Sequence, residues 1–201
     1  MLFNRMVWPK IALGILLCEL AGVVGTIWTI SGARDWYPGL IKPPWAPPAW
    51  VFGPIWMLLC ALIGVPLGLV WAMDDQTPRK KRAVTWFFVQ LLLGMAWSAA
   101  FFGGRSPGWG YAVILLLWLS IAATLWLFSK ISRPAGWLLV PYFAWVTFAS
   151  ALNFGILSLN VLQPKVQKMD KDPRNGPTDQ KEPAATLRGH ASLTRFANTL
   201  R

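Results

Sequence analysis

The stretch that decides the arrangement of this chain runs from Trp36 to Trp56 and reads WYPGLIKPPWAPPAWVFGPIW. It holds four tryptophans and six prolines but a single charged residue, Lys42. Because proline fixes φ and removes a backbone donor, most of the stretch can be neither helix nor the centre of a sheet. The sequence therefore predicts a stiff, partly extended cap that carries flat aromatic rings, and its end, from Val51 onward, already belongs to the next helix.

The composition predicts an integral membrane protein. Of the 201 residues, 55% are hydrophobic and 13% are charged, whereas soluble domains carry about 25% charged residues. The net charge of +11 is a property shared with proteins that bind nucleic acid. Most of these cations flank apolar runs, however, which favours membrane anchoring and a positive-inside orientation. We therefore expect the lipid bilayer as a partner and no nucleic acid.

Five apolar runs are long enough to cross the hydrocarbon core, which needs about 20 residues. We expect spans at about 7–30, 51–72, 83–103, 109–128 and 135–162. Residues 1–162 are therefore predicted to form an all-α bundle of five transmembrane helices with a Pro/Trp-rich first loop. The charges leave the orientation open. The cations of the loops favour an N-terminus on the inner side, but the basic tail weakens this preference. The choice between an inner and an outer membrane is open as well.

The composition changes sharply at Gln163, where prolines begin to alternate with charged and small polar residues. Residues 163–201 are predicted to be a basic, disordered tail. A weak membrane-surface helix over 193–200 is the alternative for its last part. The lone His190 has no partners at ligand spacing, so we expect no metal site there.

One carboxylate and two thiols in the first two apolar runs are candidates for a chemical role. A carboxylate inside a membrane span, here Glu19, is a functional candidate by default. A protonated Glu19, or one hydrogen-bonded to a neighbouring helix, is the favoured interpretation over a ligand or proton role. Cys18 and Cys60 both lie in apolar surroundings, and we expect buried thiols that act as small hydrophobes and no disulfide.

Helical geometry at 100° per residue divides the third span into two faces. One face is predicted to be a pocket wall and carries Gln90, Gly94, Trp97 and Phe101. The opposite face is predicted to pack closely against a helix and carries Ala96, Ala99 and Gly103. Small residues of this kind serve contacts within a chain and contacts between subunits equally well, so intramolecular packing and a dimer interface both stay open.

The fifth span directs several polar groups toward one interior. Tyr142 offers a hydroxyl, Trp145 an indole N–H and Asn153 an amide, with Phe148 at the other edge of the same stripe. Aromatic stripes are more often core packing, but flat apolar surface with a few donors also suits a large planar ligand. The sequence shows no Ser/His/Asp set and no phosphate-binding glycine loop. Ligand binding therefore outranks catalysis.

Two long motifs resemble the TspO/MBR family of translocator proteins, also called tryptophan-rich sensory proteins. The first is Trp36-Tyr-x-x-Leu-x-Lys-Pro-x-Trp-x-Pro-Pro followed by Val51-Phe-Gly-Pro-x-Trp56. The second is Leu139-Val-Pro-Tyr-x-x-Trp145 with Phe148-Ala-x-x-Leu-Asn153 and Leu159-Asn160. Gln90-Leu91 with Trp97 and Phe101-Phe102 is similar to the third helix of that family. The resemblance covers about residues 10 to 160 and leaves out the tail.

The resemblance implies a five-helix membrane bundle, often a homodimer, whose first loop closes over a pocket for porphyrins such as protoporphyrin IX or haem. No obligatory cofactor is implied. Trp56 and Trp145 match the tryptophans that some bacterial relatives need for light-dependent porphyrin breakdown. From the motifs and the helical faces together, we expect ligand contacts from Trp36, Tyr37, Trp45, Pro47, Trp56, Gln90, Trp97, Phe101, Tyr142, Trp145, Phe148 and Asn153.

The chain departs from the family pattern at two positions of the third helix. Gly94 stands in place of the usual Asn, and Ala99 in place of the usual Pro. The Tyr and Arg of the animal cholesterol motif are missing from 154–158, so strong sterol binding is not expected and the chain resembles a bacterial-type member. The leading functional hypothesis is a tetrapyrrole-binding sensor or regulator of porphyrin and stress metabolism. A transporter of porphyrin-like or other amphipathic metabolites and a light-dependent porphyrin-degrading enzyme are the alternatives.

Overall fold

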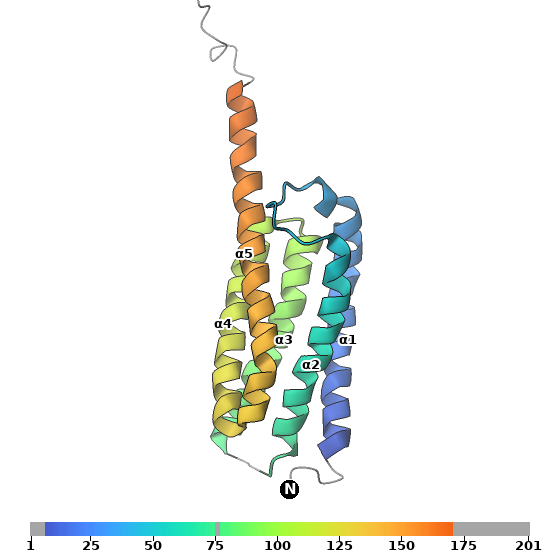
Figure 1. Cartoon of the computed structure of the whole chain (residues 1–201), viewed down its shortest axis with the longest axis vertical. Coiled ribbons are helices and arrows are strands. Elements are labelled where there is room, and N and C mark those ends of the chain that lie inside the picture. Colours follow the sequence, from blue (N-terminus) through green and yellow to red (C-terminus); the bar gives the residue numbers. More distant parts are fainter. Residues whose placement is uncertain (1–6, 75–76, 171–201) are drawn as a thin grey trace, which may run out of the picture. The chain divides into compact units, whose positions relative to one another are not determined.

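The computed structural model describes residues 7–74 and 77–170, with side chains as far as residue 160. Five helices in it are long and apolar enough to cross a membrane. They are α1 (Val7–Asp35), α2 (Phe52–Ala72), α3 (Pro78–Ser98), α4 (Pro107–Ile131) and α5 (Arg133–Asp170). No strand occurs among the described residues. The predicted all-α fold with five transmembrane helices is confirmed (Figure 1).

The helices extend beyond several of the predicted spans, and the largest difference is at the end of α5. Helix α5 continues to Asp170, so residues 163–170 are helical and the predicted tail does not begin as disordered chain at Gln163. Gln, Lys and Met residues there favour helix, but Pro164 disfavours a helix interior, so local propensity does not explain the extension. The remainder of the predicted tail, with His190 and the alternative helix over 193–200, lies outside the described residues.

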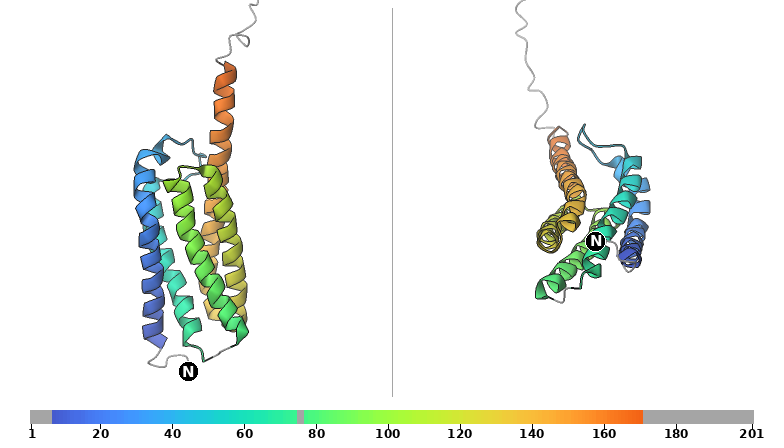
Figure 2. Two further views of the ribbon diagram at one scale, coloured as in Figure 1. Left: turned by 180° about the vertical axis from the view of Figure 1, so that it is seen from behind. Right: turned by 60° about the horizontal axis from the view of Figure 1, so that its bottom comes forward.

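Residues up to Val161 form one compact unit, and the five helices of this unit close into a ring. Helix α1 packs against α2 on one side and α3 on the other, and α3 packs against α4. The ring pair Phe52–Trp145, with centroids 5.9 Å apart, joins α2 to α5. The pair Trp118–Phe143, at 5.0 Å, joins α4 to α5. The order around the bundle is therefore α1, α2, α5, α4, α3 (Figure 2).

The starts of α3 and α4 follow from the same local chemistry. Thr77 and Ser106 each accept a hydrogen bond from the backbone N–H three residues later. In both helices the next residue is a proline, Pro78 or Pro107, whose fixed φ suits the first helical position. Short polar breaks with this pattern end one span and begin the next.

The closest helix contact is between α1 and α2, and glycines make it possible. A Cβ on Gly68 would lie 2.6 Å from the backbone nitrogen of Ile11, and one on Gly64 would lie 2.7 Å from the carbonyl carbon of Gly14. No side chain fits at such distances. Small residues four positions apart on α2 therefore let the two backbones touch, as is usual for helices in membranes.

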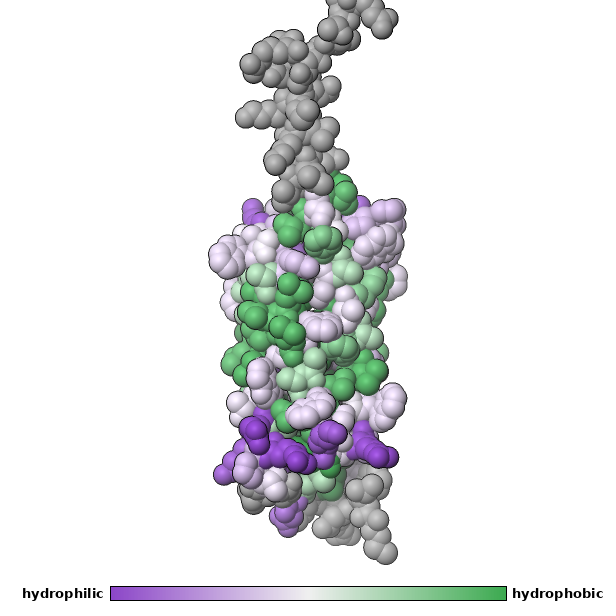
Figure 3. Space-filling view, turned by 90° about the vertical axis from the view of Figure 1, so that its left-hand side faces the viewer, coloured by the Kyte–Doolittle hydropathy of each residue, from purple (hydrophilic) through white to green (hydrophobic). Residues whose placement is uncertain are grey.

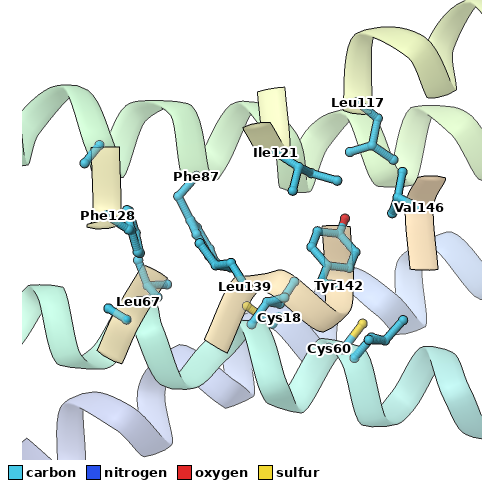
Figure 4. Close-up of a cluster of buried hydrophobic side chains, with 14 of the residues drawn as sticks. Cys18, Cys60, Leu67, Phe87, Leu117, Ile121, Phe128, Leu139, Tyr142 and Val146 are labelled. Carbon is cyan, nitrogen blue, oxygen red and sulfur yellow. The ribbon is translucent and has the colours of Figure 1, made fainter. Parts of the chain in front are cut away.

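The end of the bundle away from the Trp36–Trp56 stretch is filled with apolar side chains. Phe87 of α3 stacks on Phe128 of α4 with ring centroids 5.9 Å apart, and Leu139 of α5 is fully buried beside them (Figure 4). Cys18 and Cys60 are buried free thiols in the same cluster. The prediction of two buried thiols without a disulfide is confirmed.

The outer surface of the bundle is suited to lipid. Large apolar residues point outward along every helix, and Figure 3 shows them over the middle of the bundle with a hydrophilic band near one end. Exposed tryptophans gather at both ends: Trp8, Trp126 and Trp137 at one, Trp50 and Trp109 at the other. Trp109 and Trp126 are ~26 Å apart along α4 at 1.5 Å per residue, close to the thickness of the hydrocarbon core. Tryptophans at these levels form the aromatic belts of a membrane protein.

The glycine contact between α1 and α2 gives a first prediction. Gly68→Ala puts a methyl group into the backbone of Ile11 and should lower the free energy of unfolding by about 1–3 kcal/mol, as overpacking does. Gly53→Ala is the matched control in the same helix, because no atom lies within 4 Å of its Cβ position. Thermal unfolding in detergent measures both. Equal unfolding midpoints for the two variants would contradict the close contact between Gly68 and the backbone of Ile11.

Candidate functional site

A cavity of about 310 Å³ lies inside the bundle at the end covered by the Trp36–Trp56 stretch. All five helices contribute to its wall. Seven of the lining residues are aromatic: Tyr37, Phe52, Trp56, Trp97, Phe101, Phe102 and Trp145. Its volume is at the lower end of the range for small-molecule sites. The cavity reaches the lipid-facing surface at α2, where the lining residue Met57 is 65% exposed.

Trp56 and Trp145 stand on different walls of this cavity, on α2 and α5. Trp145 is held by ring contacts with Phe52 at 5.9 Å and Phe148 at 5.5 Å. The Trp56 indole lies between two glycines, because its Nε1 is 3.3 Å from the Cβ position of Gly22 and its Cη2 3.8 Å from that of Gly94. Glycine at 22 and 94 thus leaves room for the ring between α1 and α3.

The amide of Asn153 connects three helices at the cavity. Its Oδ1 accepts a hydrogen bond from the indole Nε1 of Trp97 at 3.3 Å, and its Nδ2 donates to the carbonyl of Pro107 at 2.9 Å. Trp97 belongs to α3, Pro107 begins α4 and Asn153 lies on α5. Both partners are needed, since an unpaired amide inside a bilayer is costly. The Trp97 ring, stacked on Phe101 at 5.5 Å, is thereby fixed as part of the wall.

A π-helical turn, η3 (Ala99–Gly103), follows α3 and sets the direction of the next two rings. The N–H of Gly104 donates to the carbonyl of Ala99 at 2.7 Å, five residues back. Such turns insert one residue into the helical register, so both Phe101 and Phe102 line the cavity. The Cβ position of Gly103 is 2.8 Å from the Trp28 ring on α1.

The Pro/Trp-rich segment of residues 36–51, which we call the lid, is attached to α5 at three places. The N–H of Ile41 donates to Asn160 Oδ1 at 3.2 Å, and Asn160 Nδ2 donates to the Ile41 carbonyl at 2.9 Å. Pro43 lies against Gly155, where a Cβ would be 2.7 Å from the proline ring. The third place is the ring contact between Trp45 and Phe148 at 5.8 Å. The segment is therefore a stiff cap, and these contacts hold it over the cavity.

Tyr37 is the aromatic residue of the lid that lines the cavity. It is buried against Phe52, Phe101 and Phe102, and its hydroxyl has no hydrogen-bond partner among the described residues. Burial raises the pKa of Tyr37, so the phenol is neutral at physiological pH and can donate a hydrogen bond. The ammonium of Lys42 lies 4.7 Å from the centre of the same ring, with its N–H groups donating to carbonyls within the lid.

Few other polar groups face the cavity. The hydroxyls of Thr26 and Thr29 donate to carbonyls of their own helix, Gly22 and Gly25. Glu19 is half-buried on α1 and lines no part of the cavity. Among the described residues, no group of three or more His, Cys, Asp or Glu side chains could hold a metal ion. What the cavity offers a ligand is flat aromatic surface and a very small number of hydrogen bonds.

The predicted ligand contacts fall into two groups. Those that line the cavity are Tyr37, Trp56, Trp97, Phe101, Trp145 and Asn153. The other six lie around it. Trp36 packs edge-on against Phe101, Trp45 and Phe148 pack on each other, and Pro47 belongs to the lid. The last two of the six, Gln90 and Tyr142, line a second, smaller cavity. A role in ligand contact stays a prediction for all twelve residues.

Sequence reasoning did not single out some residues that the structure places at the site. Phe52 and Phe102 line the cavity; both stand in the quoted motifs, but neither was predicted to contact a ligand. Asn160 and Gly155 hold the lid. Asn160 stands in a quoted motif, but no contact with the first loop was predicted for it. Nothing local in the sequence pairs Gly155 with a proline more than a hundred positions earlier.

A dimer interface on the small-residue face of the third span stays a prediction. Ala96 of α3 is exposed and Ala99 of η3 is half-buried, while Gly103 packs against Trp28 of the same chain. Contact within the chain therefore accounts for the small residue at Gly103. The exposed Ala96 has room for either kind of contact. Both alternatives for Ala96 and Ala99 stay open.

These features define a multi-pass integral membrane protein in which five helices enclose an aromatic cavity beneath a proline-rich lid. The sequence model of the TspO/MBR family matches residues 14–159, and the chain belongs to this family. The predicted family membership is confirmed.

Three relatives illustrate the similarity. The chain is 43% identical over 150 residues to the tryptophan-rich protein TspO of Chlorobaculum tepidum, which covers 75% of this chain and 95% of the relative. It is 32% identical over 156 residues to the tryptophan-rich sensory protein of Cereibacter sphaeroides, covering 78% and 96%. It is 37% identical over 145 residues to the translocator protein of Homo sapiens, covering 71% and 86%.

The attachment of the lid gives a second prediction. Asn160→Ala removes both hydrogen bonds to Ile41, and the amide of Ile41 should exchange with deuterium about 10-fold faster, since such bonds contribute about 1 kcal/mol. Ser158→Ala is the control at the same end of α5, because the Ser158 hydroxyl donates only to Phe154 of its own helix. Unchanged exchange at Ile41 in Asn160→Ala would mean that the other contacts alone hold the lid.

Proposed function

We propose that this chain is a membrane receptor that binds porphyrins and related tetrapyrroles in the aromatic cavity and acts as a sensor or regulator of porphyrin and stress metabolism. The observation that carries the proposal is the set of seven aromatic residues around one cavity with few polar groups. Flat apolar ligands gain most from such a wall, since offset or edge-on ring contacts add about 0.5–1.5 kcal/mol each to the burial of apolar area.

The polar groups of the cavity are placed for orientation rather than for affinity. Tyr37 offers a neutral hydroxyl whose hydrogen-bonding capacity is not used by the described residues. Asn153 and Trp97 use theirs on each other. A ligand with a large apolar face is therefore favoured, provided that its charged substituents lie outside the aromatic wall, because an unpaired charge in this setting is expensive to bury.

The size of the cavity bears on how a macrocycle would bind. At about 310 Å³ the site is small for a whole tetrapyrrole, and two features can provide further space. The cavity reaches the surface beside Met57, which is 65% exposed, and the lid depends on a few contacts with α5. We expect the lid to move outward when the ligand binds, with one edge of the macrocycle extending toward the lipid.

The names of the relatives add a second candidate. The human relative is named a translocator protein, and the opening of the cavity beside Met57 would also suit transfer of an amphipathic metabolite to or from the bilayer. Saturable flux of porphyrin across vesicles that contain the protein would favour this transport function over sensing.

The third prediction tests the binding site itself. Protoporphyrin IX added to the purified protein should quench its tryptophan fluorescence in a saturable manner. Trp56→Ala and Trp145→Ala each remove one wall of the cavity, and each should weaken binding at least 10-fold, the equivalent of about 1.4 kcal/mol. Trp137→Ala is the control, because Trp137 is 73% exposed at the opposite end of the bundle. Equal affinity in all three variants would place the ligand elsewhere.

A further inference from the structure

Gln90 is a polar residue in the middle of the bundle whose role is not explained by the large cavity. It lies on α3, its side chain is 0% exposed, and neither its Nε2 nor its Oε1 has a hydrogen-bond partner among the described residues. A buried amide left without partners costs about 1–3 kcal/mol. Buried polar groups in folded proteins are nearly always paired with protein or with ordered water, so the surroundings of Gln90 show what its partner can be.

Gln90 lines a second cavity, which lies between α1, α2, α3 and α5. The volume of this small cavity is about 10 Å³. One water molecule requires about this much space. Trp56 lines both the small cavity and the large one. The Trp56 indole is thus a partition between them, with Gly22 and Gly94 on either side of the ring.

The chemistry of the small cavity selects its occupant. Gln90 presents an acceptor, Oε1, and a donor, Nε2. The indole Nε1 of Trp56 is a further donor on the Gly22 side, and Gly22 lines the small cavity too. Trp56 makes no hydrogen bond through this N–H to another described residue. An anion only accepts hydrogen bonds and a metal cation offers none, whereas water can donate to Oε1 while accepting from an N–H group. The available space admits nothing larger.

We propose that one water molecule is bound by the Gln90 amide in the small cavity behind Trp56, and that this water accepts a hydrogen bond from the Trp56 indole and holds the ring in place. Gln90 is then a positioning residue for the wall of the large cavity. It acts through the water on Trp56 and touches no ligand itself. The proposal holds whichever ligand the large cavity binds, because it concerns the protein without ligand.

Nuclear magnetic resonance of the full chain with 15N-labelled tryptophan tests the proposal in the absence of ligand. Trp56→Phe identifies the Trp56 indole signal. In the unaltered protein this signal should show an exchange or NOE cross-peak to a bound water. Gln90→Leu, which keeps the length of the side chain and removes the amide, should abolish that cross-peak and shift the Trp56 indole proton upfield, as loss of a hydrogen bond does. The signals of the other tryptophans should stay in place.

Two further variants separate a positioning role from a merely structural one. Gln90→Glu should keep the cross-peak, because a carboxyl group buried here stays protonated and still offers a donor and an acceptor. Thr124→Val removes a buried hydroxyl of α4 that donates to Ser120 of its own helix, and it should leave the Trp56 signal unchanged. An unshifted Trp56 signal in Gln90→Leu, or no cross-peak to water in the unaltered protein, overturns the proposal.

A crystal structure at a resolution that shows ordered water gives an independent answer if Gln90→Leu proves unstable. Density for one water within hydrogen-bonding distance of both Gln90 and Trp56 Nε1 supports the proposal. Protein partners for both atoms of the Gln90 amide overturn it. Neither result depends on tetrapyrrole binding, so failure of this proposal and failure of the proposed function are distinguished.

Discussion

In a bilayer the hydrophobic effect does not press helices together, so this bundle depends on close packing and on a few hydrogen bonds between helices. Two contacts meet that requirement. Gly64 and Gly68 bring α2 against the backbone of α1. The amide of Asn153 connects α5 to Trp97 of α3 and to Pro107 of α4. The first contact makes a pair of helices and the second a group of three.

The aromatic cavity lies between these two groups of helices, which explains its position and its wall. The pair contributes Trp56 of α2, and the group of three contributes Trp97 and Trp145. At the other end of the bundle, rings such as Phe87 and Phe128 stack directly on one another. The end under the lid is held open instead, because the Asn153 network and the π-helical turn η3 keep their rings on the wall. Binding space is thus a consequence of how the helices are connected.

Hydropathy and the proline-rich stretch were sufficient to predict the five helices, since bilayer thickness sets the length of each span. The helical faces of the fifth span directed Trp145 and Asn153 to one interior, and the family resemblance added Trp56; all three line the cavity. The π-helical turn could not be predicted, since a constant 100° per residue assumes that the register of α3 continues past Ser98. The attachment of Ile41 by Asn160 joins residues 119 positions apart, and no periodic pattern reports on such a contact.

The two departures from the family pattern on the third helix have physical consequences in this chain. With Ala99 in place of proline, its N–H donates to the carbonyls of Met95 and Ala96, so α3 passes without a break into the turn that directs Phe101 and Phe102. With Gly94 in place of asparagine, no side-chain amide stands beside Gln90, and the Trp56 ring lies close to the backbone of α3. The Gln90 amide has no partner among the described residues, and the water that we propose in the small cavity supplies one. Trp56 is therefore coupled to the polar chemistry of Gln90 on one side and to the ligand cavity on the other.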